Sequence, residues 1–120
     1  MSTNNTGAVI RAYYDAWTAK DFDRAVSLLA GELKVEVPVN DYPTTESFAA
    51  ALKSFGSMST RAELLAAMSA GPEGMLLYDM DVPGLGTFRV AEHFTVKDGT
   101  ITRIRQIHDT AALRAAGFVS

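Results

Sequence analysis

The sequence contains no cysteine among its 120 residues. This absence excludes disulfide bonds, thiolate metal sites and cysteine nucleophiles. Basic residues are few and scattered, and the formal net charge is −3. Because nucleic-acid binding depends on clustered Lys and Arg side chains that neutralise phosphates, we expect no nucleic-acid partner.

Long apolar runs are also missing. No stretch approaches the ~20 apolar residues that a membrane-spanning helix needs, and the first residues, MSTNNTG, lack the apolar segment of a signal peptide. We therefore expect a cytoplasmic protein with no membrane partner. The 48% hydrophobic content is typical of globular domains. The length predicts a single domain over residues 1–120, in which residues 1–7 form a flexible tail.

A long β-hairpin over residues 85–109 is the strongest local signal in the chain. Its turn is Asp98-Gly99, a dipeptide that suits the positive φ angles of a type I′ turn. Alternate residues of the first strand share one face, and four of the five from 88 to 96 are large and apolar. The exception is Glu92. A carboxylate in a core-facing row must be paired, protonated or placed in a cavity, so Glu92 is a candidate functional residue.

Helical spacing and strand-like alternation divide the rest of the chain. Residues 60–69 are compatible with a helix on propensity, but their alternation and their neighbours favour a strand. The order of helices first and an antiparallel meander afterwards predicts an α+β domain. The expected helices are 8–19, a short one between Asp21 and Gly31, 45–54 and one after Asp109, and the expected strands are 33–39, 60–69, 75–82 and the hairpin.

The last strand has two possible registers. A plain hairpin places Glu92 opposite Arg105 and turns two arginines inward, which is costly. A β-bulge soon after Ile101 instead turns Gln106 and His108 inward and frees both arginines. We prefer the bulge, although the alternation alone leaves both registers open.

The order of elements, together with the segments DFDRAVSLLAG and FTVKDGTITRI, resembles the nuclear transport factor 2-like superfamily in its SnoaL-like branch, which includes polyketide cyclases and ketosteroid isomerases. The resemblance implies a cone-shaped, strongly curved, antiparallel or mixed sheet wrapped around three helices, a short C-terminal helix and an apolar pocket inside. The family includes isomerases, cyclases, epoxide hydrolases, dehydratases and non-catalytic binding domains, so the fold does not define the function.

The resemblance also implies roles for single residues. Tyr13 corresponds to the oxyanion-hole tyrosine of the steroid isomerases, and Glu92 to their neutral acid. The catalytic base of those isomerases is replaced by Val37, and the aspartate of the polyketide cyclases by Gln106. These two replacements favour a non-catalytic protein, because neither side chain can exchange a proton.

We therefore expect a protein with a pocket for an apolar, oxygen-bearing organic molecule. The protein would act on this molecule without a cofactor. His108 would transfer a proton while Glu92 and Tyr13 donate to a developing oxyanion, in an isomerase, cyclase or dehydratase. The expected pocket-lining residues are Trp17, Tyr78, Gln106, Phe88, Phe94, Phe55 and Met80.

Each assignment has a structural alternative. Tyr13 and His108 could simply pack in the core, and Asp109 could cap the last helix. Glu92 and His93 point to opposite faces of their strand, so we expect no metal site. The alternative function is a binding or dimerisation domain without chemistry, and we expect a homodimer through the convex sheet face.

Overall fold

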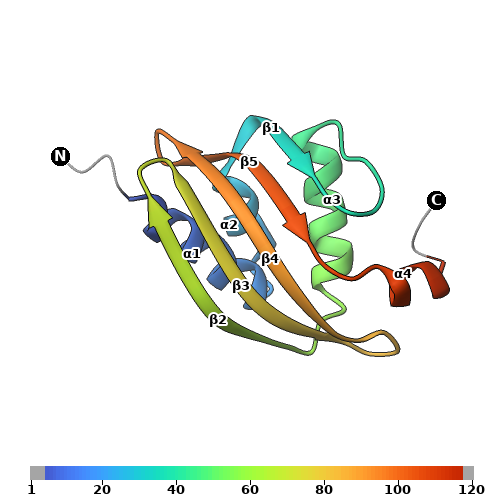
Figure 1. Ribbon diagram of the computed structural model, residues 1–120. Helices are drawn as coiled ribbons and strands as arrows, with labels where there is room; N and C mark the ends of the chain where they lie inside the picture. The colour runs from blue at the N-terminus through green and yellow to red at the C-terminus, as the bar shows by residue number, and fades with distance from the viewer. Residues whose placement is uncertain (1–4, 118–120) are drawn as a thin grey trace.

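The structure is a computed structural model that describes residues 5–117, and its centre is a curved, mixed sheet with the strand order β1-β5-β4-β3-β2 (Figure 1). Only the β1–β5 pair is parallel within the described residues. The strands are β1 (Leu29–Glu36), β2 (Arg61–Ala70), β3 (Glu73–Val82), β4 (Gly86–Lys97) and β5 (Thr100–Ile107).

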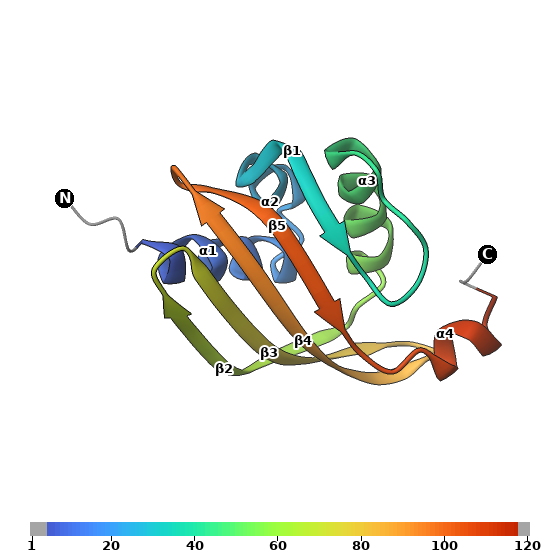
Figure 2. The ribbon, with the colours of Figure 1, turned by 45° about the horizontal axis from the view of Figure 1, so that its top comes forward.

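Three helices from the first half of the chain lie on one face of the sheet, and the other face carries no helix among the described residues (Figures 1 and 2). A short fourth helix follows β5 and lies beyond the end of that strand. This arrangement confirms the predicted α+β class and the curved sheet around the helices. The helices are α1 (Thr6–Thr18), α2 (Phe22–Ser27), α3 (Thr45–Gly56) and α4 (Ala111–Ala115).

The predicted hairpin joins β4 to β5. Asp98 and Gly99 have φ angles of 53° and 78°, as a type I′ turn requires. Val96 pairs with Ile101 and Thr95 with Arg103, so one residue of β5 is left without a partner. The predicted bulge after Ile101 is therefore confirmed.

The bulge sets the face of every later residue of β5. Ile104 is fully buried, and Gln106 pairs with Glu92 on the inner face. Arg105 points outward, where its Nε lies 2.7 Å from Oε2 of Glu36. The bulge thus keeps Arg103 and Arg105 out of the core, where a buried charge without a partner would be costly.

Several predicted boundaries are wrong. α2 ends at Ser27 and β1 begins at Leu29, not at residue 33, so Gly31 lies inside a strand rather than after a helix. The cause is non-local, because Leu29 pairs with Ile101 of β5. β1 also ends at Glu36, before Pro38, which has no N–H to donate to a sheet.

The start of the chain is ordered earlier than predicted. α1 begins at Thr6, so the expected tail is too long by at least two residues. The Thr6 hydroxyl is buried and donates to the carbonyl oxygen of Gly71 at 2.7 Å. Of the remainder of the expected tail, Asn5 is described and its carbonyl oxygen accepts from the N–H of Val9 at 2.9 Å, whereas residues 1–4 lie outside the described residues. α3 likewise extends to Gly56 rather than residue 54, behind a capping box at Thr44.

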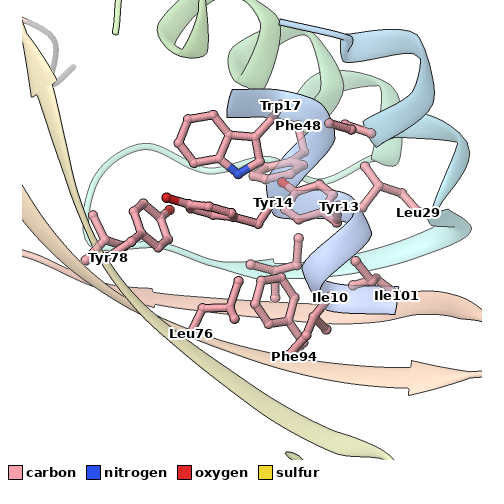
Figure 3. Close-up of a cluster of buried hydrophobic side chains, with 14 of the residues drawn as sticks. Ile10, Tyr13, Tyr14, Trp17, Leu29, Phe48, Leu76, Tyr78, Phe94 and Ile101 are labelled. Atoms are coloured by element: carbon pink, nitrogen blue, oxygen red, sulfur yellow. The ribbon is translucent and has the colours of Figure 1, made fainter. Parts of the chain in front are cut away.

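The core lies between α1 and the concave face of the sheet. Figure 3 shows Ile10 and Tyr13 of α1 near the strands that carry Leu76 and Phe94. Trp17 lies beside Tyr14, with ring centroids 5.6 Å apart. Gly74 of β3 lies against α1, and a Cβ there would meet Ile10 Cδ1 at 2.7 Å, so the Ile10 side chain would have to shift. No helix within residues 5–117 is long and apolar enough to cross a membrane.

Candidate active site

A cavity of about 220 Å³ lies between the concave sheet face, α1 and α3. It is lined by nine of the ten side chains that the sequence singled out: Tyr13, Trp17, Phe55, Tyr78, Met80, Phe88, Glu92, Gln106 and His108. Phe94 is the exception. It is fully buried and packs edge-on against Tyr13, with ring centroids 5.8 Å apart, so it supports the lining without reaching the cavity.

Glu92 is the only carboxylate among the described residues that line the cavity, and its side chain is almost fully buried. The Tyr78 hydroxyl donates to Oε1 at 3.1 Å, and Gln106 Nε2 donates to Oε2 at 2.7 Å. Burial raises the pKa of Glu92 to about 7, although both hydrogen bonds act in the opposite direction. Glu92 therefore populates its acid and its base form near neutral pH.

Tyr13 supplies a hydrogen-bond donor beside Glu92. Its ring is buried, and within the described residues no group accepts a hydrogen bond from its hydroxyl. Burial, and then the charge of Glu92, raise the pKa of Tyr13 well above its usual value. The hydroxyl therefore stays protonated at all physiological pH values and is available to donate to a ligand.

Aromatic side chains line the cavity on the side of β3. The rings of Trp17 and Tyr78 both line the cavity, with centroids 5.6 Å apart. Tyr14 packs behind them, at 5.6 Å from Trp17 and 5.2 Å from Tyr78 (Figure 3). Because these three rings brace one another, the Tyr78 hydroxyl is held toward Glu92.

His108 follows the end of β5, two residues after Gln106, and lines the cavity without joining this hydrogen-bonded group. Its ring packs edge-on against Phe88 at 6.0 Å, and its Nδ1 lies 3.0 Å from the carbonyl oxygen of Asp109. Among the described residues, no hydrogen bond joins His108 to Glu92. The Asp109 carboxylate accepts from the backbone N–H of Ala111 at 3.1 Å, at the start of α4.

Part of the lining was not predicted. Most of these residues come from the loop after β1 and from α3, and α4 contributes one. Phe48, Leu52 and Phe55 recur at helical spacing, which predicts one apolar side of α3, but the spacing cannot show that this side faces a cavity rather than solid core. The unpredicted lining residues are Val37, Val39, Asn40, Tyr42, Phe48, Ala51, Leu52, Ser54, Gly56, Met58, Val90 and Leu113.

Within residues 5–117, no three His, Asp or Glu side chains lie together in a way that could hold a metal ion. The lining also holds no Lys or Arg among its described members. The arrangement brings together one titrating carboxyl group, one free phenol and one imidazole in an apolar surround. Such a set can exchange a proton with a bound molecule and donate to an oxygen on it.

Solved structures share this architecture. A protein from Kribbella flavida DSM 17836 is 30% identical, with a TM-score of 0.86 over 92% of this chain and 91% of that one. A candidate ketosteroid isomerase from the same organism is 15% identical, with a TM-score of 0.78 over 89% and 79% of the two chains. An epoxide hydrolase from M. tuberculosis, of the LEH-like type, is 19% identical, with a TM-score of 0.74 over 92% and 87%.

No curated protein matches the sequence. The family model for the SnoaL-like domain matches residues 10–104. This range includes most of α1, all five strands in whole or in part, and every predicted site residue except Gln106 and His108. The chain therefore belongs to the SnoaL-like domain family.

Proposed function

We propose that the cavity binds a small, mostly apolar molecule with a carbonyl oxygen and moves a proton on it without a cofactor. The reaction class is isomerisation, cyclisation or dehydration, each of which begins with loss of a proton beside the carbonyl group. One observation carries the proposal: Glu92, whose pKa burial raises to about 7, lies in the same apolar cavity as the free hydroxyl of Tyr13.

In the proposed mechanism, the carboxylate form of Glu92 removes a proton from the carbon next to the carbonyl group. The electron pair moves onto the carbonyl oxygen, and Tyr13 donates a hydrogen bond to the resulting enolate. Tyr78 and Gln106 hold the carboxylate in position. In an isomerisation, the protonated Glu92 then returns the proton to a different carbon, so no external acid or base is consumed.

The roles differ in part from those expected from the sequence. His108 was the expected proton carrier, but its contacts are with Phe88 and Asp109. Glu92 is instead the group in the cavity whose pKa is raised to about 7. We therefore propose His108 as a residue of the cavity rim. The relatives named as an isomerase and an epoxide hydrolase are consistent with proton-transfer chemistry in this fold.

The second candidate function is ligand binding without turnover. Val37 and Gln106 favour it, because both line the cavity and neither can exchange a proton. The two functions differ in one measurable property. A protein that only binds a ketone leaves its α-protons in place, whereas the proposed enzyme exchanges them with solvent.

The Tyr13→Phe variant tests the proposed enzyme. We expect it to slow both the conversion of cyclohex-3-enone to cyclohex-2-enone and the exchange of its α-protons in D₂O by about 10²-fold, because one donor to the enolate is lost. The ring and its packing against Phe94 remain. Absorbance of the conjugated enone and proton NMR measure the two rates.

Tyr14→Phe is the matched control, since Tyr14 lies on the same helix but does not line the cavity. It should retain the wild-type rates. If the wild-type protein neither isomerises nor exchanges the ketone but still binds it, the function is binding. Equal rates in the Tyr13 variant and the wild type would remove Tyr13 from the mechanism.

We also propose that the protein forms a homodimer through the convex face of the sheet. The centre of this convex face is a row of apolar residues across four strands. Along the row, Ala66 pairs with Leu77, Leu77 with Ala91 and Ala91 with Ile107. Ile107 and the neighbouring Met68 are each 70% exposed. Ion pairs such as Arg89–Asp79 and Arg105–Glu36 border this row, which resembles an apolar interface centre with a polar rim.

Ile107→Asp tests the dimer. We expect it to weaken self-association by at least about tenfold, because a carboxylate buried in an apolar interface lacks a partner. Size-exclusion chromatography with light scattering measures the mass over a concentration series. Ala50→Asp, which adds the same charge to the exposed side of α3, should leave the mass unchanged. A wild-type protein that is monomeric at every concentration contradicts the proposal.

A further inference from the structure

The size of the cavity limits its ligand. The cavity measures about 220 Å³, whereas an apolar cavity of about 150 Å³ in another protein accommodates benzene. The space therefore suits one six-membered ring with a few substituent atoms, or about ten non-hydrogen atoms in all. A fused system of four rings exceeds it.

The lining also limits the charge of the ligand. Glu92 and His108 are its acid and imidazole, and no described lining residue is Lys or Arg. A ligand carboxylate or phosphate would be buried beside Glu92 without a cation, which is strongly unfavourable.

The Tyr13 hydroxyl still needs a hydrogen-bond acceptor, so it favours a ligand that carries one. Both oxygens of Glu92 already accept hydrogen bonds from Tyr78 and Gln106, whereas the Tyr13 hydroxyl has no acceptor among the described residues. An ammonium group carries donors only and cannot satisfy Tyr13. A carbonyl oxygen can.

One aromatic side chain of the lining, Phe88, lies well away from Glu92 along β4. Phe88 lies four residues before Glu92 on the same face of β4, or about 13 Å along the strand. Its ring contacts Phe55 of α3 at 6.1 Å and His108 at 6.0 Å, so three elements meet there. Phe88 therefore sets the distance over which a ligand can extend from Glu92.

From these features we infer that the ligand is a neutral compound of a single ring whose carbonyl oxygen faces Tyr13, and that Phe88 is the residue that excludes larger ring systems. The inference rests on the proposed function, because it takes the ligand site to be this cavity. To the proposed function it adds the size and the charge of the ligand, and it names Phe88 as the residue that determines specificity.

Ligand binding can be measured by the fluorescence of Trp17, because it is the single tryptophan of the chain and lines the cavity. Its fluorescence, corrected for ligand absorption, is followed in titrations with five probes. Acetophenone, benzoate and benzylamine share one ring and differ in charge, while carvone and androst-4-ene-3,17-dione share an enone and differ in ring number. We expect saturable quenching by acetophenone and carvone, and at least about tenfold weaker binding of the other three.

The Phe88→Ala variant tests the specificity residue. We expect it to bind androst-4-ene-3,17-dione about tenfold more tightly than the wild type does, with little change for acetophenone. Phe88→Leu makes a smaller opening and gives the same direction of change if the alanine variant does not fold. Leu65→Ala removes an apolar side chain of β2 that is 40% exposed and does not line the cavity, and it should alter no affinity.

The outcomes separate the inference from the proposed function. Tight wild-type binding of the steroid, or of benzoate or benzylamine, overturns the inferred size or charge and leaves a ligand-binding cavity intact. An unchanged steroid affinity in both Phe88 variants removes Phe88 as the specificity residue. If no neutral probe changes the fluorescence of Trp17, the proposed function fails together with the inference.

Discussion

Replacing Glu92 with glutamine should lower the rate of cyclohex-3-enone isomerisation by about 10³-fold, within the range expected for loss of a general base. Glutamine has the same shape and can still accept a hydrogen bond from Tyr78, so the cavity should keep its form. Only the exchangeable proton is lost. The rate is measured from the absorbance of the conjugated product, and ligand binding from the fluorescence of Trp17.

A matched control comes from the outer face of the sheet. Glu73 pairs there with His93, whose Nε2 lies 2.7 Å from Oε1 of the glutamate. Glu73→Gln removes a carboxylate from the same sheet without touching the cavity, and it should leave the rate unchanged. A Glu92→Gln protein that binds and turns over the ketone like the wild type would refute the proposed mechanism.

The same substitution should change how stability depends on pH. Burial raises the pKa of Glu92 from its ordinary 4.5 to about 7, so between these values the folded protein binds more protons than the unfolded chain. The free energy of unfolding therefore falls as the pH rises through this range, and does not fall further above it. Between about pH 4 and about pH 8, the wild type should lose about 3 kcal/mol relative to Glu92→Gln.

Urea denaturation of both proteins across this pH range measures the difference. Other carboxylates also titrate, because Arg89 and Arg61 lower the pKa values of Asp79 and Asp81, and these groups lose their stabilising effect in acid. Their contribution is the same in both proteins and cancels in the comparison. A difference that stays constant with pH would mean that Glu92 is ionised normally and is in contact with water.

Local features were predicted correctly where they depend on a few adjacent residues. The Asp98-Gly99 turn follows from backbone preferences, and the bulge after Ile101 follows from the cost of burying arginine. The start of β1 was wrong because it depends on pairing between Leu29 and Ile101, which are far apart in the chain. No local pattern carries that information.

The candidate site also has one part that the sequence predicted and one part that it could not predict. Glu92 was recognisable because a carboxylate interrupts an apolar row, but its partners Tyr78 and Gln106 come from two other strands. Phe88 and Phe94 share one face of β4 and were both expected at the cavity. Tyr13 covers Phe94, whereas Phe88 faces the space beside α3, and only the packing of the helices distinguishes them.

By itself, the sequence determined the class of fold, the hairpin and the presence of one acid on a core-facing strand, because these follow from alternation, turn chemistry and the cost of burying charge. The tertiary structure alone decided that this acid meets two donors in a small cavity and that an unpaired phenol lies in the same lining. The physical reason is that a pKa and a cavity volume depend on which distant elements pack together, and this packing is a property of the whole fold.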